Sequence, residues 1–233
     1  FVGSKLWHGL FGGSSDFAGD GTADVVIEVH SGDSTTAIGQ TLQERNVVSS
    51  SKAFVEAAAA NPAIAAIQPG FYKVRTEIPA SSAVQRLADP ASRVGQMVIP
   101  EGRQLDDVAD VKTDAVTKGI LSLISDASCV DLDGTRACVS ADDLKRAAGT
   151  ADLGALSVPG WATAEATAMG DDHRRLEGLI APGSWNVNPS GSAEQILASL
   201  IGASAAQYEA NGLLAAAETT GMSPYEILVV ASL

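Results

Sequence analysis

The chain has 233 residues, of which 45% are hydrophobic and 18% are charged. The charged share lies below the roughly 25% of an average soluble domain, so the sequence predicts a folded core and not a disordered chain. The formal net charge is -13. Because no cluster of Lys and Arg interleaved with aromatic residues offsets it, a nucleic-acid partner is excluded. The sequence contains no run of about 20 apolar residues, which is the length that a membrane-spanning helix needs.

Residues 1–23 differ from the rest in composition. Phe1 to Phe11 combine aromatic and aliphatic residues with Lys5, which suits the interfacial end of a membrane anchor lying further upstream. The alternative is a sticky terminal segment with no membrane role. Gly12 to Gly21 consist mainly of Gly, Ser and Asp, a composition typical of a linker.

Residues 24–100 predict a small β-α-α-β unit followed by a further helix and strand. Val25, Ile27 and Val29 alternate with their neighbours as in a half-buried strand. The remaining elements are a helix capped by Ser34 or Thr35 and ending near Arg45-Asn46, a helix over 53–60 capped within Ser49 to Ser51, a strand over 71–74, a helix capped by Ser81-Ser82, and a strand over 93–99.

Residues 101–233 predict mainly helices. The expected elements are a helix over 104–111, an alanine-rich helical stretch over 113–168 broken at Pro159-Gly160, an irregular segment over 176–188, and a helix over 192–214. Ser223 and Pro224 then begin a helix whose apolar run, 227–230, needs a core to pack against. We therefore expect the chain to be part of a larger protein.

Two cysteines, Cys129 and Cys138, flank Asp133-Gly134. Asp-Gly favours a tight turn, which would place the cysteines opposite one another in a hairpin near 126–140. We predict a disulfide and hence an oxidising, extracytoplasmic compartment. The alternative is a cytosolic hairpin with two free thiols.

Other polar residues give no sign of a metal or cofactor. His8, His30 and His173 lack ligand spacing, so no metal site is expected. No phosphate-binding glycine loop or nucleophilic serine motif is present. Arg174-Arg175 follows Asp171-Asp172, which predicts a locally neutralised, solvated face.

Several short motifs, in order, resemble one family. Leu176-Glu177-Gly178 followed by Pro182-Gly183-Ser184-Trp185, and the segment from Met222 to Leu233, are similar to stretches of the endolytic murein transglycosylases, the MltG or YceG-like family. Val98 to Gly102 and Gln68 to Tyr72 resemble the end and the inner strand of that family's LysM-like subdomain. The resemblance spans about Val25 to Leu233. It departs at Gly183, where the family usually has an acidic residue.

The resemblance implies an α+β protein. A LysM-like β-α-α-β subdomain (24–100) would follow a juxtamembrane segment and linker (1–23) and precede the first part of a catalytic domain (101–233), with the cysteine hairpin as an insertion. It also implies an enzyme, anchored in the cell membrane by a single span, whose extracytoplasmic domain cleaves nascent peptidoglycan and leaves 1,6-anhydro-muramyl ends. The catalytic glutamate would lie beyond Leu233, so no residue of this chain is assigned as the acid.

The implied partners are peptidoglycan glycan strands and cell-wall synthases, with no cofactor. The alternative function is a non-catalytic module that binds peptidoglycan or scaffolds the synthesis machinery. Three residues are candidates for substrate binding. Trp185 and Tyr225 could stack on sugar rings or pack in the core. Glu177 is expected to accept hydrogen bonds from backbone amides of its own irregular loop, with a substrate contact as the alternative.

Overall fold

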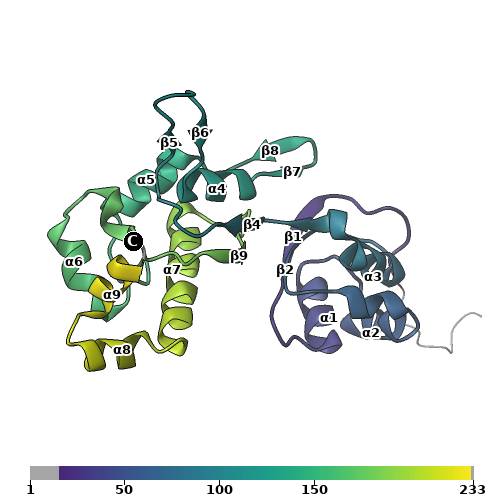
Figure 1. Cartoon of the computed structure of the whole chain (residues 1–233). Coiled ribbons are helices and arrows are strands. Elements are labelled where there is room, and N and C mark those ends of the chain that lie inside the picture. Colours follow the sequence, from purple (N-terminus) through teal and green to yellow (C-terminus); the bar gives the residue numbers. More distant parts are fainter. Residues whose placement is uncertain (1–15, 232–233) are drawn as a thin grey trace, which may run out of the picture. The chain divides into compact units, whose positions relative to one another are not determined.

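The computed structural model describes residues 16–231, which form an α+β protein as predicted (Figure 1). The chain divides into two compact units after Arg93. Most of the predicted juxtamembrane segment lies outside the described residues. Within residues 16–231, no helix has the length and apolar character needed to cross a bilayer.

The first unit has the β-α-α-β order that the sequence predicts. Its elements are β1 (Asp24–Val29), α1 (Thr35–Glu44), α2 (Ser51–Ala59), the 3-10 turn η1 (Pro62–Ala66), β2 (Gly70–Arg75), α3 (Ala80–Ala88) and the 3-10 turn η2 (Pro90–Ser92). β1 and β2 are antiparallel, with Ile27 opposite Tyr72, and β3 (Arg93–Val94) continues the sheet beside β2. The helices bury Leu42, Phe54 and Leu87 against this sheet.

Serine caps begin α1 and α2, where Ser34 and Ser50 accept from the amides of Ala37 and Ala53. The predicted caps of α3 are wrong. That helix begins at Ala80, before Ser81-Ser82, and its amide donates to Asp16 Oδ2 over 2.9 Å. A carboxylate from the segment predicted as a linker therefore satisfies an amide at the start of α3, which has no side-chain cap of its own.

The strand predicted over 93–99 is two strands. Gly95 has a φ of 75° and separates β3 from β4 (Gln96–Ile99). β4 pairs with β9 (Gly183–Asn186), a strand inside the segment predicted to be irregular, and Met97 lies opposite Trp185. This pairing places β4 in the second unit, so the division falls earlier than the boundary expected after residue 100.

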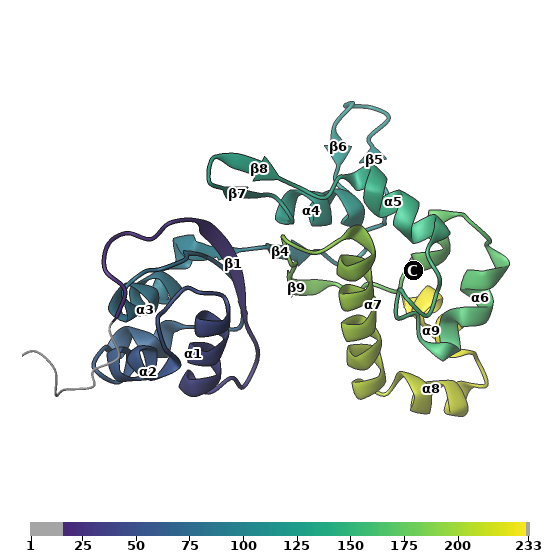
Figure 2. The ribbon, with the colours of Figure 1, turned by 180° about the vertical axis from the view of Figure 1, so that it is seen from behind.

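The second unit is mainly helical around one core. Besides β4 and β9 it contains β5 (Val108–Ala109), β6 (Val116–Thr117), α4 (Ile120–Ala127), β7 (Val130–Leu132), β8 (Thr135–Ala137), α5 (Ala141–Thr150), η3 (Gly160–Ala162), α6 (Thr163–Ala168), η4 (His173–Leu176), α7 (Ala193–Ala210), α8 (Leu213–Thr220) and α9 (Pro224–Ala231). α7 packs against α5, and its buried face includes Ile196, Leu200 and Ile201 (Figure 2).

The helix predicted over 104–111 is absent, and the segment leads into the hairpin of β5 and β6. Asp110 Oδ1 accepts from the amides of Lys112 and Thr113 at 2.7 and 2.9 Å. These side-chain bonds stabilise a turn in place of a helix. Val108 and Val111 are 45% and 97% exposed.

The cysteine hairpin is confirmed. β7 and β8 are antiparallel, Leu132 lies opposite Thr135, and a disulfide joins Cys129 to Cys138. Asp133 and Gly134 have φ values of 51° and 79°, as a two-residue type I′ turn requires.

The helix predicted over 192–214 ends at Ala210, because Gly212 takes a φ of 90° and α8 begins after it. The terminal helix is present as α9. Its start is a reciprocal cap in which the amide of Glu226 donates to Ser223 Oγ and the amide of Ser223 donates to Glu226 Oε2.

Arg175 is buried, contrary to the predicted solvated face. Its Nε donates to the carbonyl of Ala148 over 2.7 Å, and Nη2 donates to the carbonyl of Ala151. These carbonyls lie at the C-terminal end of α5, where helical partners are missing. Arg174 behaves as predicted and pairs with Asp172 on the surface. Arg175 therefore fixes η4 against α5.

Gly95→Ala is expected to destabilise the β4–β9 pair strongly. An added Cβ would lie 1.9 Å from the carbonyl oxygen of Val187, at a positive φ. We expect a loss of about 3 kcal/mol or more in the free energy of unfolding. Gly102 is the matched control, since it also has a positive φ but an added Cβ meets open space. Gly102→Ala should cost only about 1 kcal/mol. Equal losses in urea unfolding would contradict the steric argument.

Arg175→Met should destabilise the second unit by about 3 kcal/mol, because buried carbonyls at the end of α5 lose their donors. Arg174→Met, the control, removes only an exposed ion pair and should cost less than about 1 kcal/mol. Chemical unfolding followed by tryptophan fluorescence measures both. A small effect for Arg175→Met would mean that water replaces the guanidinium.

Candidate functional site

Glu177 links two distant segments of the second unit. It follows η4 and is half-buried, and both carboxylate oxygens lie 3.2 Å from the amide nitrogen of Leu105. The sequence predicted that Glu177 accepts from amides of its own loop, whereas the amide that it binds belongs to Leu105, 72 residues earlier in the chain. Burial raises the pKa of Glu177, although the hydrogen bond from Leu105 opposes the shift.

Asp106, next to Leu105, is the centre of a charged network. Its Oδ1 lies 2.8 Å from Lys145 Nζ on α5, and its Oδ2 lies 2.8 Å from His173 Nε2 on η4. The close ammonium group of Lys145 is the main reason that the pKa of Asp106 is lowered, with His173 adding to the effect. The network therefore joins α5 and η4 to the segment that also binds Glu177.

A hollow of about 420 Å³ lies beside this network. Asp106, Asp107, Asp142 and Lys145 contribute charge to its wall, and Leu105 and Leu121 contribute apolar surface. Asp107 Oδ1 accepts from the amide of Gly119 at 2.7 Å, and this bond lowers the pKa of Asp107. The side chains of the wall are thus held by α5 and by the start of α4.

Tyr225 lies on α9 and is packed, partly buried, against the core of the second unit. Burial chiefly, and then the charges of Glu177 and Glu165, raise the pKa of Tyr225. Glu165 lies on α6, and its Oε2 is buried without a hydrogen-bond partner within residues 16–231. α6 packs against η4, which precedes Glu177, and α9 packs against η3, so two sequence candidates, Glu177 and Tyr225, belong to the same part of the second unit as an acidic residue that the sequence did not single out.

Trp185 belongs to β9, and its indole Nε1 donates to the carbonyl of Ala181 over 2.9 Å. The rings of Trp185 and Tyr225 are partly buried against the core of the second unit. This position fits the core-packing interpretation of both residues and leaves part of each ring accessible. The geometry alone does not assign a sugar contact to either ring, so that role stays a prediction.

Three residues of the site were not singled out in the sequence, namely Asp106, Lys145 and Glu165, and His173 was considered only as a metal ligand. Lys145, Glu165 and His173 lie on α5, α6 and η4, whereas Asp106 lies in the loop before β5, and no local spacing connects them. Within the described part of the chain, no group of three or more His, Cys, Asp or Glu residues is arranged to hold a metal ion.

Comparison with known proteins relates the chain to one family. The profile of the YceG-like family matches residues 27–233. A YceG-like protein from Listeria monocytogenes, known from a crystal structure, is 17% identical with a TM-score of 0.33, and the match covers 88% of this chain. The chain spans 61% of the length of that protein. No curated protein matches the sequence.

Glu177→Gln should flatten the pH dependence of stability. The pKa of Glu177 is raised above its ordinary 4.5 in the folded state. The folded protein therefore holds this proton more tightly, and stability falls as pH rises from about 4.5 through the higher folded pKa. A glutamine at this position cannot titrate, so the fall should be shallower. Urea unfolding from about pH 4 to pH 7 measures the slopes, with exposed Glu194→Gln as control. An unchanged slope in Glu177→Gln would refute the prediction.

Proposed function

Because this chain belongs to the YceG-like family, we propose that it comes from an endolytic peptidoglycan lytic transglycosylase. The family match covers nearly the whole described chain. The activity is our inference from the family resemblance, and the residues after Leu233 are expected to supply the catalytic glutamate.

One observation carries this proposal further. The Leu-Glu-Gly stretch and the terminal helix are separate motifs of the resemblance, yet both pack into the core of the second unit, through Leu176 and Tyr225, and the charge of Glu177 contributes to the raised pKa of Tyr225. α9 also packs beside η3, next to the helix that bears Glu165. This geometry supports a site in which the segment leading to the expected glutamate begins beside Glu177.

The proposed reaction needs one carboxyl group. The glutamate protonates the glycosidic oxygen as the bond from that oxygen to the anomeric carbon breaks. The 6-hydroxyl of the same sugar attacks the anomeric carbon, and the glutamate takes up its proton, which leaves a 1,6-anhydro end. Because the nucleophile is intramolecular, no activated water is required. The second carboxylate of ordinary glycosidases is therefore dispensable.

We assign Glu177 a positioning role in this site. It fixes the backbone at Leu105 through its carboxylate, while Trp185 and Tyr225 remain candidates for stacking on sugar rings. The proposal also includes extracytoplasmic glycan strands as substrate, cell-wall synthases as partners, and an N-terminal membrane anchor. The disulfide supports an oxidising compartment.

Cleavage of purified, uncrosslinked glycan strands tests the function. A longer form that includes the glutamate expected beyond Leu233 should release internal fragments with anhydro ends, detected by mass spectrometry. Residues 1–233 alone should release none. Replacement of that glutamate by glutamine should abolish cleavage, with a rate loss of at least about 100-fold.

Control incubations need folded protein, checked by circular dichroism. Folded long protein that releases no anhydro-ended fragment would refute the lytic activity. If it still co-sedimented with peptidoglycan, the non-catalytic binding or scaffolding module would become the better account.

A further inference from the structure

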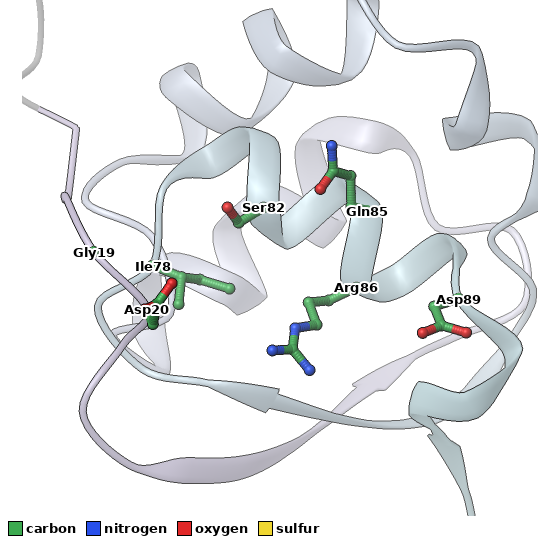
Figure 3. Close-up of a pocket in the computed structure, with 7 residues that line it drawn as sticks. All are labelled: Gly19, Asp20, Ile78, Ser82, Gln85, Arg86 and Asp89. Atoms are coloured by element: carbon green, nitrogen blue, oxygen red, sulfur yellow. The ribbon is translucent and has the colours of Figure 1, made fainter.

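A second hollow lies wholly within the first unit, on the side of α3 (Figure 3). It has a volume of about 310 Å³, near the lower end of the range for small-molecule sites. One wall is the extended segment at Gly19 and Asp20, and the other is α3 with Asp89 at its end. No part of this hollow enters the proposed transglycosylase site.

The wall formed by the extended segment is fixed at both ends. On one side, Asp16 accepts from the amide of Ala80. On the other, the amide of Thr22 donates to the carbonyl of Thr76 over 3.0 Å, and the hydroxyls of these threonines lie 2.8 Å apart. Between them, Gly21 has no space for a side chain, since an added Cβ would lie 2.6 Å from the oxygen of Thr76. The extended segment at Gly19 and Asp20 is therefore a fixed wall of the hollow.

Arg86 projects from α3 into this hollow, between the carboxylates of Asp20 and Asp89 (Figure 3). Within residues 16–231 its guanidinium makes no hydrogen bond or ion pair, whereas Asp89 Oδ1 is already bonded to the amide of Ala91. Ser82 and Gln85 add two uncharged polar side chains to the same wall. The hollow thus presents an exposed guanidinium flanked by two acidic groups.

The charges select the class of ligand. A guanidinium binds a carboxylate through two parallel hydrogen bonds. A simple anion would be repelled by Asp20 and Asp89, and a simple cation would be repelled by Arg86. A ligand that carries both a carboxylate and an ammonium group can pair with Arg86 and with one of the two aspartates.

We propose that this hollow binds a short zwitterionic peptide, with its carboxylate on Arg86 and its ammonium group toward Asp20 or Asp89. Peptidoglycan stems that contain a diamino acid have both groups, so they are the expected source. The choice of source rests on the proposed function, whereas the charge pattern does not. The first unit would then bind the peptide part of the substrate and not only its sugars.

Titration of the isotope-labelled full chain with a diamino-acid stem tetrapeptide tests this proposal by NMR. Amide signals of residues 19–20 and 82–89 should shift. The same peptide with its carboxyl groups amidated, or with its amino groups acetylated, should bind at least about tenfold more weakly. A peptide-free disaccharide should leave these signals in place.

Arg86→Gln should raise the Kd for the tetrapeptide by at least about tenfold. Arg45→Gln is the matched control, because Arg45 is also exposed, lies in the same unit and is remote from the hollow's lining residues. It should leave the Kd within about twofold. Since Arg86 lies on the surface, its loss should not unfold the unit, and circular dichroism verifies this.

Three results would overturn the proposal: no shift with the tetrapeptide, equal binding by Arg86→Gln, or equal binding of the blocked peptides. These outcomes are separable from failure of the proposed function, because the titration does not depend on cleavage. If the protein bound the peptide but its longer form cleaved no glycan, the proposed peptide site would be supported and the proposed lytic activity would be refuted.

Discussion

The second unit depends on how the buried C-terminal end of α5 is satisfied. The C-terminal end of a helix exposes carbonyl groups that lack donors. Burying such a group without a donor costs more free energy than most side-chain contacts contribute. Arg175 supplies donors to the carbonyls of Ala148 and Ala151 from within η4. Gly149 permits the close approach, since an added Cβ would lie 2.5 Å from the carbonyl of Asp171. The chain from His173 to Glu177 therefore has little freedom, and the site inherits this geometry.

This constraint separates two carboxylates that belong to one network. Glu177 is held where burial favours its neutral form, whereas Asp106 is held beside Lys145 and His173, where its ionised form is favoured. Leu105 links the two carboxylates, because its backbone amide donates to Glu177 and Asp106 is the next residue in the chain. Acid groups with pKa values shifted in opposite directions are typical of working sites. Here the opposite pKa shifts arise because the backbone holds Glu177 in a half-buried position and Asp106 beside Lys145 and His173.

The sequence was informative where the signal is local. Serine caps, the Asp-Gly turn and the capped helix at Ser223 each act within a few residues, and the structure contains all three. Prediction failed where a distant partner decides. The helix predicted from residue 104 does not form where the amide of Leu105 is bound by the distant Glu177. Arg175 looked like one half of a surface pair, because nothing in its neighbourhood reveals the end of α5.

The hairpin of β7 and β8 has a practical consequence. Its strands are short and largely exposed, yet the bond between Cys129 and Cys138 fixes their register covalently. The disulfide therefore keeps the ends of the two strands together even when the turn residues Asp133 and Gly134 are changed. A fluorophore or an affinity tag placed at Asp133-Gly134 would report on the protein in an oxidising compartment. In a reducing cytosol the disulfide would not form, and the same label would lie on a hairpin without its covalent link. The label would therefore also distinguish the compartment in which the chain had folded.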